Sequence, residues 1–170
     1  IMGLFNFGKK KAQKVENVKP VEKFEVKKIK ERSFMLAISK YPEEWKDIQL
    51  LQRRIENATD FKFLQVSQDS DGNPCHKIEY QGTAYQFAIY PEPYEIPEMF
   101  RIQHFFADLD VEEIGKQKMG IMVAMDYAEN PLESYHLQLK IINTLFPETL
   151  AVLDYSAEKL LSGTWLAFAA

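Results

Sequence analysis

The most constraining feature of the sequence is a series of three short apolar segments in the middle of the chain, separated by two turn sequences. Phe61–Ser67 alternates with period two, and Cys75–Tyr80 and Thr83–Tyr90 follow it. Asp69–Pro74 is rich in turn-forming residues, and Gln81–Gly82 is short enough for a tight hairpin. The pattern therefore predicts an antiparallel meander of three strands.

The segments on either side of the meander predict a mixture of strands and helices. Strands are expected at 33–39, 120–125, 150–154 and 164–170, and helices at 43–57, 108–118, 131–146 and, as a short turn, 156–161. Residues 91–97 contain three prolines and predict a rigid extended crossing, whereas 99–106 fits either an edge strand or the start of a helix. Together these elements predict an α+β, two-layer domain with a mixed, largely antiparallel sheet and packed helices.

Charge divides the chain into a basic arm and an acidic body. Residues 1–32 contain ten Lys/Arg and four Glu, whereas residues 33–170 contain eleven Lys/Arg and twenty-one Asp/Glu. We expect a flexible arm at 1–32 and a single α+β domain at 33–170, the N-terminal part of a longer protein. An acidic body argues against a nucleic-acid partner, because phosphate binding requires clustered positive charge.

The start of the arm combines apolar and cationic residues. Three large apolar side chains within Met2–Gly8 precede the run Lys9–Lys11, a combination that could give weak peripheral contact with a membrane. The competing interpretation is a solvated leader that only precedes the fold. A single cysteine, Cys75, forms no internal disulfide, and this favours a cytoplasmic location.

The helix expected at 131–146 is apolar on more than one side. One stripe contains Leu132, Tyr135, Leu139, Ile142 and Phe146, and a second contains Leu137, Ile141 and Leu145. Such a helix is buried between two layers or lies at an interface. We therefore expect a non-enzymatic interaction module in which Leu137, Ile141 and Trp165 contact a protein partner or a further domain of the same chain. Packing within one core is the alternative.

A second hypothesis places a ligand-binding or hydrolase site at the end of the strand 150–154. Asp154 and Ser156 follow that strand directly, and His136 or His104 would have to lie next to them to act as a base. The sequence lacks the Gly-x-Ser-x-Gly turn that exposes a serine nucleophile. The structural alternative is that Asp154 or Ser156 caps the following turn.

Metal and cofactor sites are not expected. Glu133 and His136 have the spacing of a helical metal-binding pair, but no second pair of this kind faces them in the sequence. The turn at 69–74 resembles a calcium loop only at its start, since Tyr80 stands where the final glutamate ligand is required. We therefore predict no metal, no cofactor and no catalytic residue.

Three stretches near the end of the chain, Leu132–Lys140, Leu153–Glu158 and Ser162–Trp165, resemble an uncharacterised bacterial domain family of unknown function. Similarity is weaker over Ile96–Glu113. The resemblance implies a bacterial cytoplasmic protein whose chain continues past Ala170. It implies no reaction, cofactor or catalytic residue.

Overall fold

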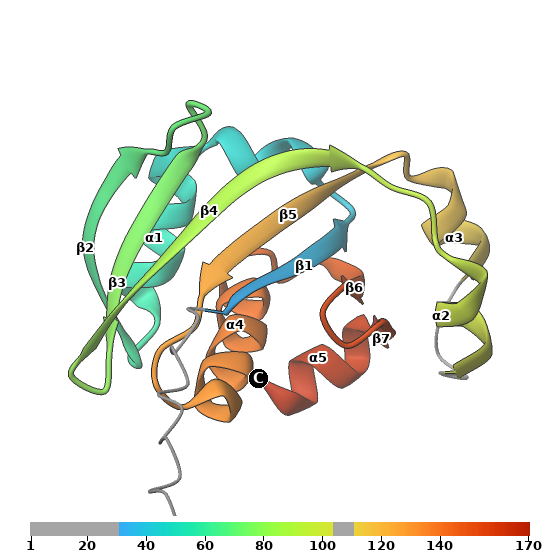
Figure 1. Ribbon diagram of the computed structural model, residues 1–170. Helices are drawn as coiled ribbons and strands as arrows, with labels where there is room; N and C mark the ends of the chain where they lie inside the picture. Colours follow the sequence, from blue (N-terminus) through green and yellow to red (C-terminus); the bar gives the residue numbers. More distant parts are fainter. Residues whose placement is uncertain (1–30, 104–110) are drawn as a thin grey trace, which may run out of the picture.

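The computed structural model describes residues 31–103 and 111–170, and these form one antiparallel sheet with helices packed on it (Figure 1). The sheet has seven strands in the order β2-β3-β4-β5-β1-β6-β7. Its strands are β1 (Arg32–Ser39), β2 (Phe61–Gln68), β3 (Pro74–Tyr80), β4 (Thr83–Pro93), β5 (Met119–Asp126), β6 (Thr149–Asp154) and β7 (Lys159–Ser162). Every pairing between these strands is antiparallel. The predicted α+β class is thus confirmed. We also predicted a mixed sheet, but the described strands form no parallel pairing.

The helices lie on both faces of the sheet. They are the 3-10 helix η1 (Pro42–Lys46) and the helices α1 (Ile48–Asn57), α2 (Glu98–Gln103), α3 (Val111–Lys116), α4 (Pro131–Leu145) and α5 (Gly163–Ala169). α1, α4 and α5 cover one face, and α2 and α3 lie at the far end of β4 and β5 (Figure 1). A smaller apolar cluster there joins Phe100 of α2 and Ile114 of α3 to Leu36 and Leu153 of the sheet.

The predicted meander is confirmed as β2, β3 and β4. At its first turn, Asp69 Oδ1 accepts hydrogen bonds from the backbone N–H groups of Asp71 (2.9 Å) and Asn73 (2.8 Å). At the second turn, Gln81 (φ 49°) and Gly82 (φ 80°) both adopt left-handed backbone conformations. This conformation at two consecutive residues is that of a two-residue hairpin turn, which matches the twist of the paired strands.

Two predicted elements begin or end elsewhere. The helix expected at 43–57 is divided at Asp47, whose non-helical backbone separates η1 from α1 and whose side chain caps α1 by accepting from Leu50 N–H (3.0 Å). β4 continues through Pro91 to Pro93, which we expected to lie outside the sheet. Beyond Ala88, β4 is paired with β5 alone, so the missing N–H groups of the prolines are tolerated on its free side.

The prediction for the last fifteen residues was wrong. Instead of a helical turn at 156–161 and a terminal strand, the chain forms the hairpin β6–β7 and then the helix α5. Glu158 (φ 53°) turns the hairpin. Ser162 Oγ accepts from Trp165 N–H (3.1 Å) and so provides the N-cap that starts α5. The arm at 1–30 and residue His104 lie outside the described residues.

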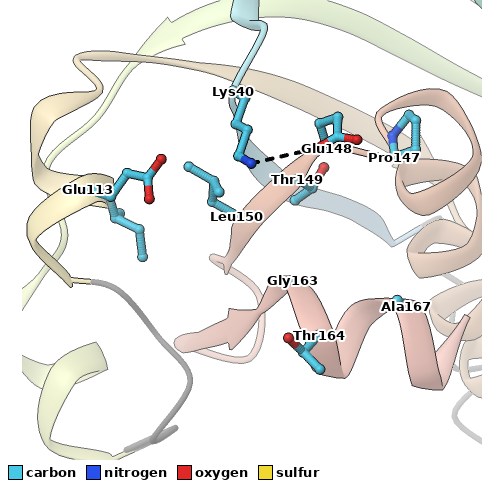
Figure 2. A pocket seen from close by; sticks show the side chains of 10 residues that line it. Lys40, Glu113, Pro147, Glu148, Thr149, Leu150, Gly163, Thr164 and Ala167 are labelled. Atoms are coloured by element: carbon cyan, nitrogen blue, oxygen red, sulfur yellow. Dashed lines mark ion pairs between the residues drawn. The ribbon is translucent and has the colours of Figure 1, made fainter.

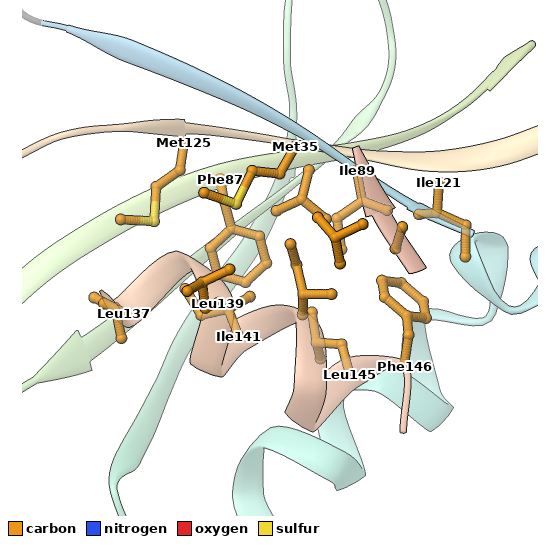
Figure 3. Close-up of a cluster of buried hydrophobic side chains, with 14 of the residues drawn as sticks. Met35, Phe87, Ile89, Ile121, Met125, Leu137, Leu139, Ile141, Leu145 and Phe146 are labelled. Atoms are coloured by element: carbon orange, nitrogen blue, oxygen red, sulfur yellow. The ribbon is translucent and has the colours of Figure 1, made fainter. Parts of the chain in front are cut away.

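The main core lies between the sheet and α4 (Figure 3). Leu137 and Ile141, which we expected at an interaction surface, are buried there with Met35, Phe87 and Leu145. The reason is that α4 has neighbours on several sides, since it contacts β5, α1 and α5. These two side chains therefore belong to the core, as in the alternative interpretation of the second stripe.

Candidate functional site

An apolar groove between α4 and α5 is the candidate site. Its volume is about 620 Å³ and it is open to solvent. Leu132, Tyr135, His136, Leu139, Trp165 and Ala169 line it, with Asn130 and Glu133 at the end where α4 begins. A largely apolar concave surface with a few polar groups at its border is typical of a binding site.

The groove exists because the two helices differ in length. α4 has fifteen residues and α5 has seven, so the seven-residue helix leaves part of the side of α4 uncovered. Leu132 at the start of α4 is 77% exposed, and Phe168 near the end of α5 is 88% exposed. Leu132 lines the groove, and a large exposed apolar side chain at an apolar concave surface is typical of an interaction site.

Capping and side-chain hydrogen bonds fix the walls of the groove. Asn130 Oδ1 accepts from Glu133 N–H (3.3 Å) and caps the first turn of α4. One turn further along α4, His136 Nε2 lies 2.8 Å from the carbonyl oxygen of Ala169 in α5. This bond joins the exposed side of α4 to the end of α5.

Tyr135 connects the groove to a buried polar cluster at the end of β6. Burial raises the pKa of Tyr135, and the negative charge of nearby Asp154 raises it further. Asp154 is fully buried, and its Oδ1 accepts from the backbone N–H groups of Ser156 (3.1 Å) and Ala157 (3.0 Å). Ser156 Oγ lies 3.4 Å from Ser33 Oγ.

The residues of the predicted ligand site are therefore only partly brought together. Asp154 and Ser156 adjoin each other, but the hydroxyl beside Ser156 is that of Ser33, which is not a base. The imidazole of His136 is bound to Ala169. Asp154 caps the β6–β7 turn through Oδ1.

The structure places Trp165 in the groove, as one of the three residues expected at an interaction surface. Three other lining residues, Leu132, Tyr135 and Leu139, come from the first apolar stripe of α4, none of whose members we named as an interaction residue. The sequence shows the two apolar stripes of α4, but it does not show which side of α4 the helix α5 packs against. The sequence signal for this was the serine cap at 162, which marks the start of α5.

A second depression, of about 490 Å³, lies between α3 and the β6–α5 region (Figure 2). Lys40 Nζ and Glu148 Oε2 form an ion pair of 3.8 Å at its border, and both side chains are about half exposed. Thr149 and Thr164 add hydroxyl groups. Exposed ion pairs of this kind contribute little to stability and are common on protein surfaces.

Metal-binding groups do not converge in the part of the chain that the structure describes, where no three His, Cys, Asp or Glu side chains are placed to hold an ion. No helix within residues 31–103 and 111–170 has the length and apolar content that a bilayer span requires.

Comparison with known proteins identifies a family match. The model of a family described as "Protein of unknown function (DUF4026) N-terminal" matches residues 33–170. No curated protein and no solved structure matches the chain significantly.

Proposed function

The chain belongs to the DUF4026 N-terminal family, and because that family's description names no activity, we propose a function from the structure. We propose that the domain is a non-catalytic interaction module that binds an apolar segment of polypeptide in the groove between α4 and α5. The observation that carries the proposal is the groove itself, an open apolar surface lined by exposed Leu132 and by the half-buried rings of Tyr135 and Trp165.

The shape and chemistry of the groove favour a polypeptide over a small polar ligand. Two helices form its walls, and an amphipathic segment can insert two or three apolar side chains between them. Trp165 and Tyr135 are residue types that often carry the binding energy at protein interfaces. Such a segment would belong to a protein partner or to a further domain of the same chain. The single cysteine supports a cytoplasmic location.

The alternative of a hydrolase or ligand-binding site near residues 154–156 has less support. Asp154 Oδ1 caps the β6–β7 turn, and the Ser156 hydroxyl lies beside that of Ser33 in β1. Neither residue lines the groove. A serine nucleophile requires an adjacent base and an oxyanion site. The interaction module needs no such arrangement.

Selection of displayed peptides would test the proposal. The targets are the full-length chain and the same chain with Leu4, Phe5 and Phe7 replaced by serine, so that no apolar segment from its own start can fill the groove. Peptides with two or three apolar anchors should be enriched on at least one target. Leu132→Asp should weaken their binding about tenfold or more, equivalent to about 1.4 kcal/mol.

Met99→Asp is the matched control, because Met99 is also an exposed apolar residue and lies on α2, outside the groove. Binding should survive this change. The proposal is overturned if neither target enriches peptides, or if the enriched peptides bind the Leu132→Asp protein as well as its parent.

A further inference from the structure

The sequence contains a segment whose composition matches that of the groove. We infer that the segment Met2–Lys11 docks in the groove between α4 and α5 of its own domain. This inference rests on the proposed function and names the segment that the groove binds when no other protein is present.

The position at which the arm joins the domain supports this assignment. The N–H of Tyr127 donates to the carbonyl oxygen of Glu31 (2.8 Å), so the first described residue is fixed beside the β5–α4 connection. That connection leads within three residues to Asn130, which lies at the end of the groove. The arm therefore leaves the domain close to the site that it would occupy.

The length of the arm allows it to return to the groove. Nineteen residues separate Lys11 from Glu31, and a flexible chain of this length has a mean end-to-end distance of roughly 25 Å. The axis of α4 is about 22 Å long for its fifteen residues. A tether that matches its span gives an effective concentration on the order of millimolar, so even weak docking would be populated.

The composition of the segment complements that of the groove. Leu4, Phe5 and Phe7 are three large apolar side chains within four positions, and the groove offers Leu132, Tyr135 and Trp165 to them. The following Lys9–Lys11 would meet a border that includes Glu133, on a body whose Asp and Glu exceed its Lys and Arg by ten. A second copy of the body would instead bring negative charge against negative charge, which disfavours dimerisation through the groove.

Fluorescence of Trp165 would test docking directly. The chain contains two tryptophans, and Trp45→Phe leaves Trp165 as the only one. In that full-length background, replacing Leu4, Phe5 and Phe7 with serine should shift Trp165 emission to the red and increase its quenching by acrylamide. Adding a synthetic peptide of residues 1–14 should reverse both effects. Phe24→Ser, an aromatic change elsewhere in the arm, is the control and should leave the emission unchanged.

Photocrosslinking provides a second measurement that does not depend on the tryptophan variant. A benzoylphenylalanine at position 132 of the otherwise unchanged chain should form an intramolecular adduct with residues 2–11. The inference is overturned if the adduct lies elsewhere, if the product has the mass of a dimer, if there is no adduct, or if the serine replacements leave Trp165 emission and quenching unchanged.

The outcomes separate this inference from the proposed function. If Trp165 is unaffected by the serine replacements but selected peptides still bind through Leu132, the groove is a docking site and the arm is not its occupant. If, in addition, the replacements abolish flotation with phosphatidylserine vesicles, the arm is a membrane-binding segment and the inference is overturned. If peptides also fail to bind, both are overturned.

Discussion

The imidazole of His76 stacks on the ring of Phe87, with the ring centroids 5.4 Å apart and the planes inclined by 9°. His76 is fully buried, and among the described residues neither of its ring nitrogens has a hydrogen-bond partner. Burial lowers the pKa of His76 to about 4, because the protonated ring would lose its hydration inside the core. This residue is therefore a neutral histidine that the fold holds without any compensating bond.

We expect acid to destabilise the domain through His76. Between pH 6.5 and pH 4 the unfolded chain binds a proton at this residue and the folded chain does not, so the free energy of unfolding falls as the pH falls. The difference between the two pKa values corresponds to a loss of about 3 kcal/mol. Urea unfolding at pH 7, 5.5 and 4 measures the loss.

His76→Phe separates this contribution from other titrating groups. Because it removes an unpaired buried N–H, the variant should equal or exceed the wild type in stability at pH 7, by up to about 3 kcal/mol. Its advantage should grow by about 3 kcal/mol as the pH falls to 4. Equal pH dependence in both proteins would show that His76 is not the titrating group.

Gly163→Ala should destabilise the fold, because a Cβ at this position would overlap the carbonyl oxygen of Thr149, which belongs to the backbone of β6 and has little freedom to move. We expect a loss of about 1 to 3 kcal/mol. Gly115→Ala in α3 is the matched control, since no atom lies within 4 Å of its added Cβ, and it should gain about 0.5 to 1 kcal/mol. Thermal unfolding of the two variants tests this, and similar melting temperatures would contradict it.

Substitutions to alanine along α4 should lower the free energy of unfolding by different amounts, depending on how deeply each side chain is buried. Leu137→Ala and Ile141→Ala remove buried side chains and should each cost about 2 to 5 kcal/mol. Leu132→Ala on the same helix should cost less than about 0.5 kcal/mol, because that side chain is exposed. Urea unfolding gives the three values. A small cost at Leu137 and Ile141 would restore them as candidates for the interaction surface.

Gln138 should be coupled energetically to Tyr127. The Gln138 side-chain amide donates to the carbonyl oxygens of Ser33 and Val123 (3.1 Å each), and its Oε1 accepts from the Tyr127 hydroxyl (2.8 Å). Gln138→Leu leaves that hydroxyl without its acceptor, whereas Tyr127→Phe removes the donor. A double-mutant cycle should give a coupling of about 1 kcal/mol, and strictly additive effects would contradict the network.

The sequence was sufficient for those parts of the fold that depend on local interactions. The meander was predictable because Gly82 and the Asp69 turn specify tight hairpins between alternating segments. Asn130 and Pro131 likewise marked the start of α4 correctly. At Asp47 the helix pattern continued on both sides, and only the cap geometry reveals the division.

The candidate site depended on tertiary contacts that no local pattern contains. Both apolar stripes of α4 are visible in the sequence. The part of α4 that α5 leaves exposed depends on the position of Ser162, where α5 begins, and β6 and β7 determine that position. Lys159–Ser162 has four residues, too few for periodicity to distinguish a strand from a helical turn. Trp165 was named as an interaction residue from the sequence, whereas Tyr135 and Leu132, which also line the groove, were not.

The order of the strands also governs how the domain can fold during synthesis. β1 is the first strand in the chain, yet it lies between β5 and β6, which follow it after roughly eighty and one hundred and ten residues. At about 5 to 20 residues per second, the ribosome needs roughly 4 to 16 s to supply the first of these partners. During that time Phe34–Ile38 is an apolar strand with both edges free, and protection of this segment by a chaperone would increase the yield of the native domain.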